Sequence, residues 1–188
     1  MAKLRNVLQT KFIGQPLHSM LSHFPLVLIP AAVALDIASL ASTGGENLFV
    51  RSAFYALLAG VVFGVLAALF GAIDSYYELR DRGPATITSY VHASGMALAL
   101  LISTISLGLR VGSLGAAETA VAPFVLAIVA SVLAIAMSWF GARLVYIYGV
   151  RVEPAPDTVT RSTSHHKEEL PDNVHRFPLS KLHIRRRQ

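Results

Sequence analysis

Long stretches without a charged side chain constrain the fold of this chain more than any other feature. Uncharged runs of 22, 27 and 24 residues cover positions 52–73, 83–109 and 119–142. A helix needs about 20 apolar residues to cross the hydrocarbon core of a bilayer. Each run therefore predicts a membrane-spanning helix.

A fourth span is predicted near the beginning of the chain. Apolar residues run from Phe24 to about Ala41 and are interrupted only by Asp36. A cleavable signal peptide is the competing interpretation, because a basic start precedes the apolar stretch. The late beginning of the stretch and its two prolines, Pro25 and Pro30, favour an uncleaved helix instead.

The predicted fold class is all-α, an integral membrane four-helix bundle with spans at about 22–41, 53–74, 89–110 and 121–147. Only 14% of the residues are charged, against roughly 25% in soluble domains. Residues 1–21 are predicted to form a basic amino-terminal segment, residues 22–150 the bundle, and residues 151–188 a polar, basic and irregular tail.

The distribution of Lys and Arg predicts the orientation in the membrane. Fourteen of the 16 basic residues fall on one side of the predicted spans, and only Arg51 and Arg110 fall on the other. Basic residues are retained in the cytoplasm, so both termini are predicted to be cytoplasmic. Tyrosines that anchor helices at the interface fall at the same level, namely Tyr76, Tyr77, Tyr90, Tyr146 and Tyr148.

Five polar residues are predicted to meet near the cytoplasmic ends of the helices. In a bundle with short loops these ends are neighbours, and ionisable residues at membrane depth usually face the interior. The candidate site residues are His18, His23, Asp74, His92 and Arg143.

Several chemistries are excluded or lack support. The chain has no cysteine, which excludes thiolate metal sites and cysteine nucleophiles. Glycine-rich phosphate loops, zinc-protease signatures and nucleophile elbows are also absent from the sequence. The sequence therefore does not indicate an enzyme, and no nucleic-acid partner is expected.

Spaced motifs in a fixed order resemble a known family. They are Gly14-x-Pro16-Leu17-His18-x-x-Leu21-x-His23-Phe24-Pro25, then Gly71-x-x-Asp74, His92, and Trp139-x-Gly141-x-x-Leu144-Val145-Tyr146-x-x-Gly149-Val150. Together they resemble the bacterial four-helix membrane family called domain of unknown function 2231, over residues 14 to about 152. Gln15 and Ser19 depart from the family pattern. The resemblance implies the bacterial inner membrane, and similar domains fused to Rieske-type iron-sulfur domains imply redox partners.

The first functional hypothesis is a haem b electron carrier with His23 and His92 as the axial ligands of the iron. Both residues open helices that start on the same side of the membrane. In a square bundle these two helices are diagonal, with their axes roughly 11 to 14 Å apart. Arg143 would pair with a propionate, whereas His18 and Asp74 would orient a ligand imidazole.

Two alternatives remain open from the sequence. His18, His23, Asp74 and His92 would coordinate a divalent metal for transport or storage, although the two histidines of the first helix point about 140° apart at ~100° per residue. Alternatively, these residues only cap and bridge helices, as in an accessory subunit of a larger membrane complex.

Two further features have less definite roles. Asp36 lies in the outer half of the first span and is expected to pair locally with a Ser, a Thr or Arg51; a proton relay is the minor alternative. The basic end of the tail, up to Arg185, Arg186 and Arg187, is expected to contact anionic lipid.

Overall fold

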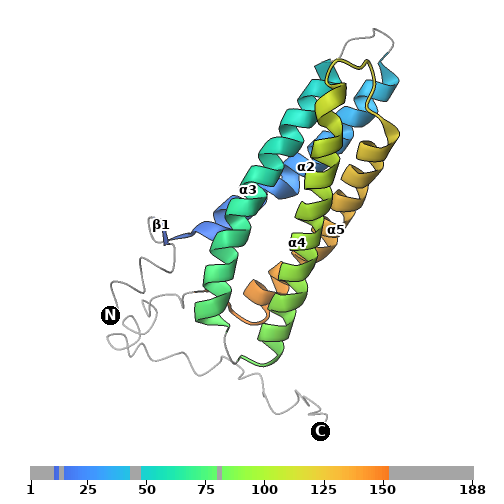
Figure 1. The fold of residues 1–188 in the computed structure, drawn as a ribbon. Helices are drawn as coiled ribbons and strands as arrows, with labels where there is room; N and C mark the ends of the chain where they lie inside the picture. The colour runs from blue at the N-terminus through green and yellow to red at the C-terminus, as the bar shows by residue number, and fades with distance from the viewer. Residues whose placement is uncertain (1–10, 13–14, 43–47, 80–81, 153–188) are drawn as a thin grey trace, which may run out of the picture. The chain divides into compact units, whose positions relative to one another are not determined.

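The computed structural model describes residues 11–12, 15–42, 48–79 and 82–152. Four long helices dominate it (Figure 1): α2 (Leu17–Ala41), α3 (Leu48–Glu78), α4 (Pro84–Arg110) and α5 (Val121–Tyr146). A short 3₁₀ helix, η1 (Val111–Ser113), follows α4. Two two-residue strands, β1 (Lys11–Phe12) and β2 (Gln15–Pro16), pair antiparallel before α2. The predicted all-α four-helix bundle is confirmed.

Each helix is long and apolar enough to cross a membrane. α2 has 25 residues, which corresponds to a length of roughly 37 Å at ~1.5 Å per residue. α2, α3 and α4 also extend beyond their predicted spans. α2 begins at Leu17 rather than near position 22, directly after Pro16, whose backbone is extended. The helix then continues unbroken through Pro25 and Pro30.

The helices pair along the chain. α2 packs extensively on α3, and α4 on α5, while lesser contacts of α3 with α4 and of α2 with α5 close the ring. α2 and α4 are therefore diagonal partners. We call the end where α3 stops and α4 starts the histidine end, and the end where α2 stops and α3 starts the ion-pair end.

Small side chains fill the interior, whereas large apolar side chains cover the outside. The buried residues of α5 include Ala127, Ala130 and Ala134, while Val27, Leu69 and Val132 are exposed. A soluble bundle would show the reverse pattern, whereas membrane helices associate through small residues that let backbones approach closely. The outer surface therefore contacts lipid.

Two glycines of α3 lie at close contacts with neighbouring helices inside this bundle. A Cβ added to Gly60 would lie 3.0 Å from Cγ1 of Ile29 in α2, and a Cβ at Gly64 would overlap Leu100 in α4. At these positions glycine lets neighbouring helix backbones approach closely, as small residues do in membrane bundles.

Glycines also shape both helix ends at the histidine end. Gly83 has φ of 54° immediately before α4, whose first residue is Pro84. Gly149 has φ of 62° after α5, and its amide donates to the carbonyl of Val145 at 3.1 Å. The turn at Gly149 lets Val150 pack beside Leu144.

Candidate functional site

His18 is fixed against α3 by its imidazole. It is the second residue of α2, and its Nδ1 lies 2.8 Å from the carbonyl oxygen of Ala67. One turn further along α3, a Cβ at Gly71 would lie only 2.7 Å from the same Nδ1. The ring therefore lies directly against the helix backbone at Gly71, where only glycine leaves the necessary space.

His92 has the same surroundings on the other hairpin. Its Nδ1 lies 2.8 Å from the carbonyl oxygen of Met137 in α5, and a Cβ at Gly141 would lie 2.9 Å from its Cε1. As with Ala67 and Gly71, the carbonyl and the glycine are four residues apart. Each imidazole thus belongs to a half-site made of a histidine, a backbone carbonyl and a glycine.

The two half-sites meet across the diagonal of the bundle. The ring centroids of His18 and His92 are 6.4 Å apart, with an angle of 84° between the ring planes. Each Nδ1 is engaged by a backbone carbonyl. Within the described part of the chain, no hydrogen bond engages either Nε2, so one nitrogen of each ring is available to a ligand.

His23 does not join this pair. It is exposed on the outside of α2, five residues and about 140° around the helix from His18, at ~100° per residue. The expectation of His23 as the partner of His92 assumed a helix that begins near residue 22. Because α2 begins at Leu17, it is His18 that faces His92.

Asp74 and Arg143 lie beyond the histidines, toward the ends of α3 and α5. Asp74 accepts a hydrogen bond from the guanidinium of Arg151, a residue with φ of 61°. The guanidinium carbon of Arg143 lies 5.0 Å from the ring centroid of Trp139, in a cation–π contact. Asp74 was expected to orient an imidazole, but the backbone carbonyls of Ala67 and Met137 hold that position.

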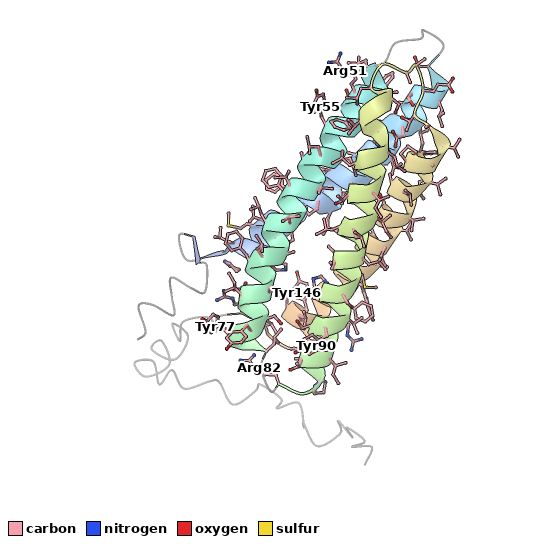
Figure 2. The ribbon with its side chains drawn as sticks, in the orientation of Figure 1. Arg51, Tyr55, Tyr77, Arg82, Tyr90 and Tyr146 are labelled. Atoms are coloured by element: carbon pink, nitrogen blue, oxygen red, sulfur yellow. The ribbon has the colours of Figure 1, made fainter. Side chains whose placement is uncertain are left out.

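Tyrosine side chains gather near this end, as the sequence predicts. Figure 2 shows Tyr77, Tyr90 and Tyr146 at the histidine end, together with Arg82. Arg51 and Tyr55 lie at the ion-pair end in the same view. The pattern is that of aromatic and basic residues at a membrane interface.

The ion-pair partner of Asp36 is not the Arg51 that the sequence suggested. Arg110, the last residue of α4, donates to both carboxylate oxygens of Asp36, at 2.7 and 2.6 Å. The Thr119 hydroxyl donates to the same carboxylate at 2.8 Å, so the expected threonine partner is present, whereas Arg51 is exposed. Asp36 and Arg110 are 0% and 1% exposed.

Hydroxyl and carbonyl groups complete this buried network. Ser106 donates to the carbonyl of Pro123 at 2.7 Å, and one guanidinium nitrogen of Arg110 also approaches that carbonyl at 3.3 Å. Ser39 donates to the carbonyl of Asp36 at 2.7 Å. A signal for the pair exists in the sequence, because Asp36 follows His18 by the same 18 residues that separate Arg110 from His92.

The described residues do not form a multidentate metal site. Among them, no group of three or more His, Asp or Glu side chains is close enough to hold one metal ion. The predicted set of His18, His23, Asp74 and His92 is therefore not assembled. What remains is a pair of imidazoles.

Fold and site together define a class: an integral membrane protein of four apolar helices with a pair of histidines across the bundle. The family described as predicted membrane protein, DUF2231, matches residues 14–154, and the chain belongs to this family. The comparisons with curated proteins and with solved structures gave no match.

Proposed function

We propose that the protein binds one haem b between His18 and His92 and carries electrons in the bacterial inner membrane. The observation that carries this proposal is the 6.4 Å separation of the two imidazole centroids. A metal bound between two imidazole nitrogens at about 2 Å each holds the centroids roughly 6 Å apart, because each centroid lies about 1 Å behind its nitrogen. His18 and His92 would therefore hold one metal between a nitrogen of each ring.

The surroundings of both rings support a role as haem ligands. Histidine ligands usually engage their second nitrogen with a carbonyl or carboxylate, which fixes the tautomer and the orientation of the ring. His18 and His92 use Ala67 and Met137 in this way. Arg143 has a guanidinium near the same end of the bundle and would neutralise a propionate. When bound, haem would supply a one-electron couple between ferric and ferrous iron.

A divalent metal ion is a weaker candidate. Zinc sites usually have four tetrahedral ligands, and two imidazoles on opposite sides of the bundle provide only two. The described residues offer no third histidine or carboxylate at this position. A role as an accessory subunit of a redox complex remains compatible with haem binding, and its partner would be an electron donor or acceptor.

The test is the visible spectrum of the full-length protein, purified in detergent after expression with added haem precursor. Oxidised and dithionite-reduced spectra should show the sharp bands of low-spin, six-coordinate haem. His18→Ala and His92→Ala should each abolish them, because each removes one axial ligand.

His23→Ala is the matched control, since this exposed histidine lies on the same helix. It should leave the spectrum unchanged. A colourless parent protein under full haem supply would exclude the proposal. Loss of the bands in His23→Ala but not in His18→Ala would return the ligand role to His23.

A further inference from the structure

The hairpins α2–α3 and α4–α5 repeat one another position by position. A shift of 74 residues takes His18 to His92 and also relates four of the five buried positions of α2 to buried positions of α4. The matched pairs are Pro25 and Ala99, Ile29 and Ser103, Ala32 and Ser106, and Asp36 and Arg110.

The second helices of the hairpins repeat with a shift of 70 residues. This shift takes Ala67 to Met137, and Phe70-Gly71-Ala72 to Phe140-Gly141-Ala142. Six buried positions of α3 recur as buried positions of α5 with the same shift; in α3 they are Ala53, Leu57, Gly60, Val61, Gly64 and Asp74. The bundle therefore has a parallel internal repeat, with a pseudo-two-fold axis along its length.

Two residues that hold the same position in the two hairpins can touch each other only where both lie near this axis. Two equivalent pairs do so here: His18 with His92 through their rings, and Asp36 with Arg110 through two hydrogen bonds. The pairs are 18 residues apart on both helices, or roughly 27 Å at ~1.5 Å per residue. Small or apolar side chains occupy the matched buried positions between the histidine pair and the ion pair. Such side chains do not specify how far one helix is shifted along the other.

Each histidine is hydrogen-bonded to the other helix of its own hairpin. His18 is held by α3 and His92 by α5, so their separation depends on how one hairpin sits against the other. Among the described residues, Asp36 with Arg110 is the only hydrogen-bonded side-chain contact that joins α2 directly to α4. The other described hydrogen-bonded side-chain contacts between the hairpins do not join α2 to α4. Ser75 with Ser89, at 2.9 Å, joins α3 to α4. Asp74 with Arg151 joins α3 to the segment after α5, and Thr119, just before α5, donates to Asp36.

We propose that the Asp36–Arg110 pair positions the two hairpins so that His18 and His92 stand at the separation of a ligand pair. A bidentate ion pair has a narrow range of lengths and angles, and burial of both charges penalises any separation of the partners. The identity of the bound group rests on the proposed function. The positioning role does not depend on it.

The test measures the spread of distances between α2 and α4 at the histidine end of the full chain. Because the chain has no cysteine, Met20→Cys and Tyr90→Cys introduce two unique sites for nitroxide labels on exposed positions. Pulsed electron paramagnetic resonance in lipid nanodiscs then gives the distance distribution without any requirement for haem.

Asp36→Leu combined with Arg110→Leu removes the pair without leaving one buried charge alone. We expect the width of the distance distribution to double at least, whereas the reversed pair, Asp36→Arg with Arg110→Asp, should restore a narrow distribution. Arg51→Leu, at an exposed arginine of the same end, is the control and should leave the distribution narrow. If the leucine pair does not accumulate as folded protein, Asp36→Asn with Arg110→Gln replaces it.

A distribution as narrow in the pairless variant as in the parent would overturn the positioning role. This outcome is distinguishable from failure of the proposed function. A protein that binds no haem but loses its narrow distribution would refute haem binding and uphold positioning. In a haem-binding protein, the pairless variant should also bind haem more weakly than the parent.

Discussion

At the scale of single residues, the site depends on two positions that have no side chain at all. Gly71 and Gly141 let the imidazoles of His18 and His92 lie against helix backbone. Each ring is thereby held between a glycine and a carbonyl oxygen of the neighbouring helix. Any larger residue at either glycine must displace the ring.

Gly71→Ala and Gly141→Ala should therefore weaken haem binding by about tenfold each, which corresponds to about 1.4 kcal/mol. The added methyl group would come within 3.0 Å of the ring in both cases, and overpacking of this kind typically costs roughly 1 to 3 kcal/mol. Titration of the haem-free protein with haem, followed in the visible spectrum, measures the change.

Gly108→Ala is the control, since a Cβ there would meet nothing within 4 Å. Equal affinities for the parent, Gly71→Ala and Gly108→Ala would show that the contact between ring and backbone is unimportant for binding.

At the scale of helices, α2 and α4 each carry two functional positions 18 residues apart. The histidine lies at one end of the bundle and a buried charge at the other. A charge buried in an apolar bundle is tolerated only with its partner, because the desolvation of an unpaired ion is very costly. Removal of either partner alone should therefore destabilise the contact between α2 and α4 at the ion-pair end.

Asp36→Asn alone should lower the free energy of unfolding by about 3 to 5 kcal/mol, since it leaves the guanidinium of Arg110 buried without a counter-charge. Unfolding in mixed detergent micelles, followed by fluorescence of Trp139, measures this change. Arg51→Gln, which alters an exposed charge, should have an effect near zero. Equal stability of the two variants would contradict a structural role of the ion pair.

At the scale of the whole molecule, the surface and the charge distribution both follow from the bilayer as solvent. Large apolar side chains face outward along all four helices, whereas the loops at the two ends differ in basic residues. Arg82 precedes α4 at the histidine end, and Glu118 lies in the segment between η1 and α5. The excess of Lys and Arg predicts that the histidine end faces the cytoplasm.

Single cysteines test this orientation directly. Glu118→Cys should react with a membrane-impermeant maleimide in intact spheroplasts, whereas Arg82→Cys should react only after the membrane is permeabilised. Both positions are exposed in the bundle, so a difference in labelling reports the side of the membrane. The opposite pattern would place the histidine end outside the cytoplasm.

Much of the fold was predictable from the sequence, because a bilayer leaves a chain few choices. Water is absent from the hydrocarbon core, so every backbone polar group must be satisfied within the segment, and a long uncharged run must form a helix. The runs over 52–73, 83–109 and 119–142 therefore determine three helices, although α4 begins at Pro84, five residues before its predicted span. His92 was also predictable as an interior residue, because ionisable groups avoid lipid.

The pairing of side chains was decided only by the tertiary structure. Whether His18 or His23 faces His92 depends on where α2 begins and how it is rotated, and five residues change that direction by about 140°. Asp36 meets Arg110 across 74 residues of sequence, and Asp74 meets Arg151 beyond the last helix. Hydropathy and charge determine which segments enter the membrane, whereas partner choice depends on helix rotation and packing, which local sequence does not encode.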